Sequence, residues 1–208
     1  MSDSTLIHVC RHGEVFNPQG MLYARLPGFH LSDRGFAMAD RLGEHFADVP
    51  LAALRVSPLE RTRETIAPIA ANHPDVPVVI DDRLIEADSL QQGFVMGRSY
   101  RALFNPRNWW LYRDFARPSW GEPYADMAAR TMAAIIDTAV SVGPGAQAVL
   151  VSHQSPIYTA RLFAEGKSLP NMQFQRQCTL ASVTTFEVVD RHVVAVRYSE
   201  PAGDLLRK

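Results

Sequence analysis

The residues best suited to chemistry lie where short apolar runs break off. Arg11 and His12 follow the apolar, β-branched run 6–10 and precede Gly13. Arg11 offers a planar fork of donors that matches a phosphate group, and the imidazole of His12 can be a nucleophile near neutral pH. Gly13 lets a ligand approach the backbone closely. Alone, the tripeptide is weak evidence, because most such sequences are ordinary strand ends.

Two more junctions carry the same residue types. Arg61 follows the strand-like run 51–56, and the most hydrophobic run, 146–151, leads into His153. Each of these functional groups comes after a predicted strand and near a predicted helix start. Two arginines and two histidines gathered near helix N-termini would make a strong site for a dianion such as a phosphoryl group.

The residues after the second and third runs predict where helices begin. Ser57 and Glu60, with a proline between them, fit a capping box, which predicts a helix from this point with Arg61 in its first turn. Ser155, also followed by a proline, predicts the cap of a later helix.

Strands and helices alternate along the rest of the chain. We predict a helix from a Ser32 cap to about residue 48, with its buried face formed by Phe36, Ala39, Leu42, Gly43 and Phe46. Further along the chain we predict a strand at 77–80, a helix at 123–142, a hairpin at 182–189 and 192–198, and a tail over the last ten residues. This pattern indicates an α/β fold, a three-layer sandwich with a mostly parallel central sheet and an antiparallel edge. Ligands bind such sheets beyond the carboxyl ends of the strands.

The composition shifts between about residues 87 and 121, where all three tryptophans lie among five arginines. We interpret this stretch as a helical lid inserted into a single domain spanning residues 1–208. Aromatic residues interleaved with arginines can also stack on bases, so an RNA-binding surface is an alternative. The lid is favoured, because the rest of the chain has no basic field.

The overall charge and the cysteines narrow the function class. A net charge of −1 and a pI of about 6.7 argue against binding nucleic acid or a membrane surface. Cys10 and Cys178 lie far apart without metal-ligand spacing, and we expect both to be reduced core residues. No histidine or cysteine set has the spacing of a metal site. The absence of a leader or a spanning segment predicts a cytoplasmic protein.

Taken together, the motifs resemble the histidine phosphatase superfamily, in its phosphoglycerate mutase-like branch. The resemblance covers most of the chain and rests on motifs in order: Arg11-His12-Gly13-Glu14, Leu31-Ser32-x-x-Gly35, Ser57-Pro58-Leu59-x-Arg61-Thr62-x-x-Thr65, Leu84-x-Glu86, Gly121-Glu122 and Val151-Ser152-His153. Several motifs in sequence order are far more specific than the first tripeptide.

The resemblance implies a role for each matching residue. His12 would be the nucleophile that carries a phosphohistidine, Arg11, Arg61 and His153 would hold the phosphate, and Glu86 would protonate the leaving oxygen. The family needs no metal, and no cofactor is expected.

Some positions near these motifs bear on the substrate. Val15 stands where Thr or Ser is common, and Gln154 replaces the usual Gly after the second histidine. We predict that Gly13, Asn17, Arg25 and Gln154 contact the substrate together with the phosphate-binding residues, since the loop at 15–30 could close over a ligand at His12.

The resulting hypothesis is a metal-independent phosphomonoesterase acting on a small phosphorylated metabolite. The alternatives are a phosphoglycerate mutase-type phosphoryl transfer, which the short chain disfavours, and a module that binds a phosphorylated ligand without turnover. Oligomeric state stays open, and a homodimer formed through the edge hairpin or the lid is one option.

Overall fold

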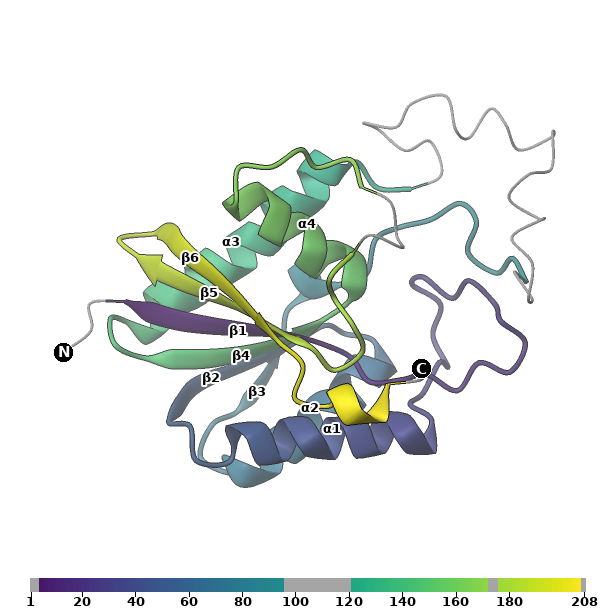
Figure 1. Cartoon of the computed structure of the whole chain (residues 1–208), viewed down its shortest axis with the longest axis horizontal. Coiled ribbons are helices and arrows are strands. Elements are labelled where there is room, and N and C mark those ends of the chain that lie inside the picture. The colour runs from purple at the N-terminus through teal and green to yellow at the C-terminus, as the bar shows by residue number, and fades with distance from the viewer. Residues whose placement is uncertain (1–3, 96–120, 172–175, 207–208) are drawn as a thin grey trace.

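A computed structural model describes residues 4–95, 121–171 and 176–206 (Figure 1). Its helices and strands are β1 (Thr5–Arg11), α1 (Asp33–Phe46), β2 (Leu51–Val56), α2 (Glu60–Asn72), β3 (Val78–Ile80), α3 (Tyr124–Val142), β4 (Gln147–Ser152), α4 (Gln154–Ala164), β5 (Val183–Val189) and β6 (His192–Ser199). Short 3-10 turns lie at Asp82–Leu84 and Gly203–Leu205.

The strands form one six-stranded sheet in the order β3-β2-β4-β1-β5-β6. The first four strands in that order are parallel, and β5 and β6 add an antiparallel hairpin at one edge. The predicted α/β class, with its mostly parallel sheet and antiparallel edge, is therefore confirmed.

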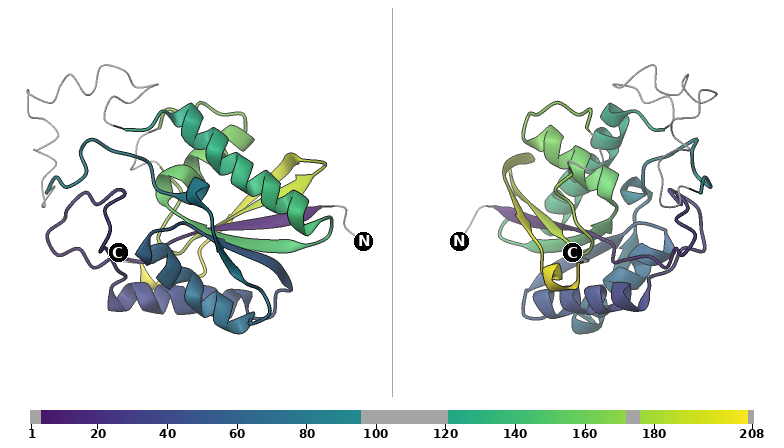
Figure 2. Two further views of the ribbon diagram at one scale, coloured as in Figure 1. Left: turned by 180° about the vertical axis from the view of Figure 1, so that it is seen from behind. Right: turned by 45° about the vertical axis from the view of Figure 1, so that its right-hand side comes forward.

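Helices cover both faces of the sheet, with α1 and α2 on one side and α3 and α4 on the other (Figures 1 and 2). The alternating side chains of the central strands explain this layering. In β4, Val149 and Val151 pack with α1 and α2, whereas Ala148 and Leu150 pack with α3 and α4. A strand buried on both faces has an unbroken apolar sequence, which is why this run is the most hydrophobic in the chain.

Two predicted helix starts are wrong. Helix α2 begins at Glu60 after Leu59 and has no side-chain cap, so Ser57 and Glu60 do not form a capping box. The Ser57 hydroxyl is instead hydrogen-bonded to His153, 2.8 Å away. Helix α4 begins at Gln154, one residue before the predicted cap Ser155. The Ser155 hydroxyl accepts a hydrogen bond from Arg176. Both serine hydroxyls that the local pattern assigned to helix caps are therefore engaged in tertiary contacts instead.

The predictions for α1 are mostly confirmed. The Ser32 hydroxyl accepts a hydrogen bond from the Gly35 amide and caps the helix. Phe36 is the exception, because it is 46% exposed and Met38 takes the predicted place in the core. The predicted C-terminal tail is also wrong in part: Ala202 is buried, and Asp204 pairs with Arg41 of α1 at 3.1 Å.

Most of the predicted lid, residues 96–120, lies outside the described residues, so the lid and the single-domain organisation stay predictions. At its base, Ser89 and Gly121 form an isolated antiparallel bridge, and Met21 forms another with Val95. In the part of the chain that the structure covers, none of the helices is long and apolar enough to cross a membrane.

A close backbone contact fixes the segment after β1. A Cβ added at Gly13 would lie 2.5 Å from the Gly35 carbonyl oxygen, and one added at Gly35 would lie 2.0 Å from the Glu14 carbonyl oxygen. The Ser32 amide also donates to the Glu14 carbonyl at 2.9 Å. The N-terminus of α1 therefore rests directly on the backbone that follows β1, and only glycine permits this approach.

We predict that Gly35→Ala destabilises the protein by about 1–3 kcal/mol, because the added methyl must push the Glu14 carbonyl away. Urea unfolding measures the change. Asp40→Ala, at an exposed site on α1, is the control and is expected to have little effect. Equal stability of Gly35→Ala and the wild type would contradict the close contact.

Candidate active site

The three junctions that the sequence singled out lie side by side. The strand order places β4 between β2 and β1. In register, Arg11 at the end of β1 lies opposite Ser152 of β4, and Val56 at the end of β2 lies opposite Val151. His12, Ser57 and His153 therefore leave the sheet at the same edge, beyond the carboxyl ends of the parallel strands.

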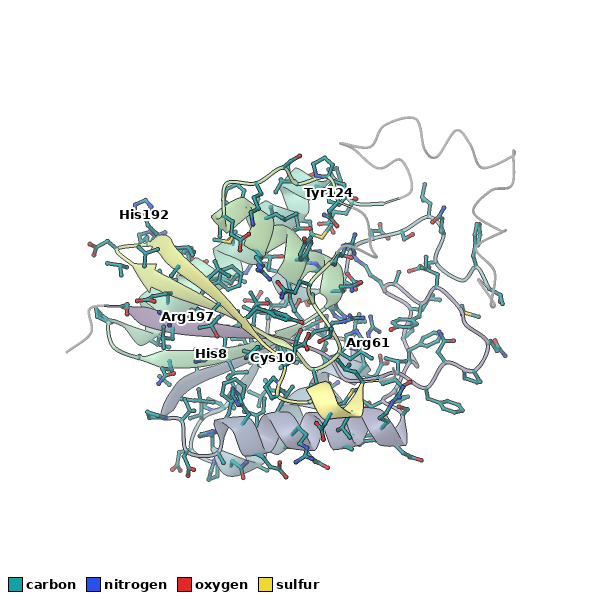
Figure 3. All side chains as sticks on the ribbon, viewed as in Figure 1. His8, Cys10, Arg61, Tyr124, His192 and Arg197 are labelled. Atoms are coloured by element: carbon teal, nitrogen blue, oxygen red, sulfur yellow. The ribbon has the colours of Figure 1, made fainter. Side chains whose placement is uncertain are left out.

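A pocket of about 340 Å³ opens at this edge, and Arg11, His12, Glu86 and Gln154 line it. Arg61 and His153 are fully buried. The centroid of the His153 ring lies 5.2 Å from that of the His12 ring, and the charge of Arg61 contributes to lowering the pKa of His12. Figure 3 shows Arg61 beyond the ends of the strands, toward the loop that follows β1.

His12 is held as a neutral imidazole with a defined tautomer. Its Nδ1 lies 2.7 Å from the Gly13 carbonyl oxygen, which can only accept, so Nδ1 carries the proton. Burial lowers the pKa of His12 well below its ordinary value, and the charges of Arg61 and Arg11 lower it further. Its Nε2 therefore keeps a free lone pair, as a nucleophile requires.

His153 lies against His12, with ring centroids 5.2 Å apart in an edge-on arrangement. Its Nε2 is hydrogen-bonded to the Ser57 hydroxyl at 2.8 Å. Burial is the main cause that lowers the pKa of His153, and Arg61 and His12 add to it. The misassigned cap residue Ser57 thus orients the second histidine.

The two arginines are anchored by backbone carbonyl groups. Arg11 donates from Nη1 to the Cys178 carbonyl at 2.6 Å, and Arg61 donates from Nη2 to the Ala24 carbonyl at 2.7 Å. The Arg61 guanidinium also lies over the Tyr23 ring, 4.8 Å from its centroid. These contacts fix both cations without neutralising them.

Several buried nitrogen atoms of these residues have no hydrogen-bond partner among the described residues: Arg11 Nε, Arg61 Nε, Arg61 Nη1 and His153 Nδ1. Unpaired buried donors are rare in folded proteins and cost free energy. A tetrahedral oxyanion between the guanidinium groups would satisfy such a set of donors. The unpaired atoms therefore point to an anionic ligand.

Glu86 is half-buried and follows the 3-10 turn after β3. One carboxylate oxygen accepts from the Ala87 amide at 2.8 Å. The Glu86 carbonyl accepts from Arg25 Nε at 2.7 Å and Arg130 Nη2 at 3.4 Å. The carboxylate of Glu122 bridges the same two arginines, at 3.0 Å to Arg25 and 2.7 Å to Arg130. Two cations and one anion thus hold the backbone of Glu86 at the edge of the pocket.

The other predicted substrate contacts are placed differently. Arg25 lies outside the pocket lining and holds the Glu86 backbone. Asn17 also lies outside it, and its side-chain amide bonds both backbone groups of Met21 within the loop. Gly13 donates its amide to the Thr65 hydroxyl at 3.1 Å, which ties it to α2.

Sequence reasoning missed several residues of the site. Ser89, Ser155 and Arg176 line the pocket. The cap-like pattern at Ser155 marked the position but assigned it another role. Arg176 lies between elements, in a stretch with no periodicity, and nothing in the sequence singled it out.

The buried histidines predict a stability that depends on pH. Because the pKa of each is lowered in the folded state, the unfolded chain binds more protons below the ordinary histidine value of 6.5. We predict that the free energy of unfolding falls as pH drops below this value, by up to about 1.4 kcal/mol per pH unit for each histidine. Urea unfolding between about pH 7.5 and about pH 5.5, in phosphate-free buffer, measures the slope.

The slope should be shallower in His12→Asn and in His153→Asn. His192→Asn is the control, because His192 lies at the exposed hairpin between β5 and β6 (Figure 3), and it should keep the wild-type slope. An unchanged slope in both buried-site variants would contradict the neutral histidine pair.

Comparison with known proteins places the chain in a family. Residues 7–201 match the model of the histidine phosphatase superfamily, branch 1. The chain is 47% identical over 203 residues to Rv0525, an uncharacterised protein of Mycobacterium tuberculosis, and the match covers 98% of this chain and all of that one.

Solved structures agree on the fold. YhfR of Bacillus stearothermophilus matches with a TM-score of 0.79 at 22% identity, covering 97% of this chain and 100% of that one. The mycobacterial glucosyl-3-phosphoglycerate phosphatase Rv2419c matches with a TM-score of 0.74 at 21% identity, covering 95% and 98%. From the family model and the close relative, we conclude that the chain belongs to the histidine phosphatase superfamily, branch 1.

Proposed function

We propose that this protein is a metal-independent phosphomonoesterase that hydrolyses a small phosphorylated metabolite through a phosphohistidine on His12. The observation that carries this proposal is the hydrogen bond from His12 Nδ1 to the Gly13 carbonyl. It leaves Nε2 unprotonated in a residue that lines the pocket. Membership in the superfamily and the likeness to known phosphatases support the reaction class.

In the first step, His12 Nε2 attacks phosphorus in line with the leaving oxygen. A P–N bond forms while the P–O bond to the substrate breaks, and Glu86 gives its proton to the leaving alkoxide. Arg11 and Arg61 stabilise the charge on the phosphoryl oxygens, using donors that have no partner among the described residues. His153 contributes a further donor from Nδ1.

In the second step, water attacks the phosphohistidine. Glu86, now a carboxylate, takes the proton of the water as the P–N bond breaks, which releases inorganic phosphate and restores the starting state. Anchoring of the Glu86 backbone by Arg25 and Arg130 supports this dual role. The same group must reach the leaving oxygen and then the water, so its position matters in both steps.

The size of the pocket supports a small substrate. Its volume of about 340 Å³ is near the lower end of the range for ligand sites, about 300–1,000 Å³. A phosphorylated metabolite of a few carbon atoms fits this volume.

The test is hydrolysis of p-nitrophenyl phosphate in the presence of EDTA, with p-nitrophenol and inorganic phosphate both measured. We predict turnover that survives chelation, releases the two products in equal amounts, and falls at least about a thousandfold in His12→Asn. The matched control is His192→Asn, at an exposed site on the edge hairpin, which should keep wild-type turnover.

The other outcomes identify the rival functions. Loss of turnover with EDTA, restored by a divalent metal, would contradict the metal-independent mechanism. Binding of phosphate esters without release of inorganic phosphate would favour the non-catalytic module. Transfer of the phosphoryl group to a second phosphoglycerate in preference to water would favour the mutase.

A further inference from the structure

The pocket lining contains a further cation, Arg176, that the proposed phosphoryl chemistry does not use. Arg176 lines the same pocket as Arg11 and His12. It comes from the segment before β5, whereas the phosphate-binding groups follow β1, β2 and β4. Arg176 is therefore an independent contribution to the site.

Neutral acceptors hold the Arg176 guanidinium in place. Its Nε donates to the Asn171 side-chain oxygen at 2.6 Å, and its Nη1 donates to the Ser155 hydroxyl at 2.8 Å. The Asn171 side chain is itself fixed, because its amide nitrogen donates to the Leu169 carbonyl at 2.7 Å. An arginine held by two such bonds loses less entropy on binding a ligand than a free one.

The charge of Arg176 is not balanced within the protein as far as the structure describes it. No carboxylate of the described residues forms an ion pair with it, and its Nη2 has no hydrogen-bond partner there. Among the described residues that line the pocket, Glu86 is the one acidic side chain, and it must be protonated when it acts as the acid. A cation of this kind, held at the wall of a small pocket, favours an anion in that pocket.

A count of charges indicates which anion this is. A phosphomonoester carries nearly two negative charges near neutral pH, and Arg11 and Arg61 supply two positive charges to match. Arg176 is a third cation, beyond what the phosphoryl group requires. A substrate with a further negative charge would balance it.

We infer that Arg176 is a specificity-determining residue that binds a carboxylate at the end of the substrate away from the phosphoryl group. This inference rests on the proposed phosphatase function and narrows it to small phosphorylated carboxylic acids. A carboxylate suits this arrangement, because Nη2 of Arg176 has no partner among the described residues and can donate to it, while Nε and Nη1 are held by the protein. Ser155 and Gln154, which also line the pocket, are polar neighbours for the same group.

The test compares two inhibitors of p-nitrophenyl phosphate hydrolysis that differ in one group. 3-Phosphoglycerate carries a carboxylate where glycerol 3-phosphate carries a hydroxymethyl group. We predict that the wild type binds 3-phosphoglycerate at least about tenfold more tightly, because a hydrogen bond between charged groups is worth a factor of this size or more. Inhibition reports binding whether or not the compounds are hydrolysed.

The decisive variant is Arg176→Gln, with Arg197→Gln as the control on the edge strand β6, where its partner is Glu187. Arg176→Gln should weaken 3-phosphoglycerate by roughly ten- to a hundredfold and leave the inhibition by glycerol 3-phosphate within about twofold. Arg197→Gln should change none of these values.

Failure of this inference differs from failure of the proposed function. If the wild type hydrolyses p-nitrophenyl phosphate but binds the two inhibitors equally, Arg176 has no carboxylate to recognise and the inference is overturned. An equal loss for both inhibitors in Arg176→Gln would overturn it too, because the residue would then support the pocket in general. If the wild type does not hydrolyse p-nitrophenyl phosphate at all, the proposed function itself fails.

Discussion

The hydrogen bond from His12 Nδ1 to the Gly13 carbonyl is the interaction on which the site depends. It exists because β1 ends at Arg11 and the chain turns at once, which brings the Gly13 carbonyl within 2.7 Å of the imidazole. The turn is held in place by Gly35, whose missing side chain lets α1 rest on the Glu14 backbone. Packing of a helix on a backbone segment thus fixes the tautomer of His12, the proposed nucleophile.

The rest of the site places positive charge around this neutral histidine. Burial lowers the pKa of His12, and the charges of Arg61 and Arg11 lower it further. In the proposed reaction the same two cations would hold the phosphoryl group that His12 would attack. A neutral His12 does not compete with the arginines for the anion, so in the proposed reaction it would attack a phosphorus atom that the arginines already polarise. In the proposed reaction, a single arrangement of charge would serve both binding and activation of the nucleophile.

The polar groups that suit this edge of the sheet to anion binding lower the stability of the free protein. Buried guanidinium and imidazole nitrogens without partners among the described residues are costly in the free protein. The apolar layers on both faces of β1 and β4 offset this cost, since the strands that carry the site are also the most deeply buried in the core. Binding of an anion would relieve it, which is why the ligand and the folded state should stabilise each other.

Much of the fold was predictable from the sequence, and less of the site. Periodicity located the strands and helices because burial on one or both faces leaves a regular apolar pattern. The junctions at His12 and His153 were predictable because polar residues follow apolar runs. The roles of Ser57 and Ser155 were not, since local capping patterns compete with contacts to His153 and Arg176 that only the folded chain brings together.

Arg25 and Arg176 show that the sequence alone does not reveal which partners a long side chain reaches. The sequence predicts Arg25 as a substrate contact, and in the structure its guanidinium binds Glu122 and the Glu86 carbonyl. It gave no signal for Arg176, which lines the pocket. In both cases the direction of a long side chain depends on partners distant in the chain, and spacing along the sequence carries no information about them.

The most direct test of the central claim is to trap the covalent intermediate. The wild type is mixed with p-nitrophenyl phosphate, quenched within milliseconds in alkali, digested, and measured by mass spectrometry. We predict an initial burst of p-nitrophenol and one phosphoryl group on the peptide that contains His12, at Nε2. Steady turnover with no phosphoryl group on that peptide, or with the group on His153, would contradict it.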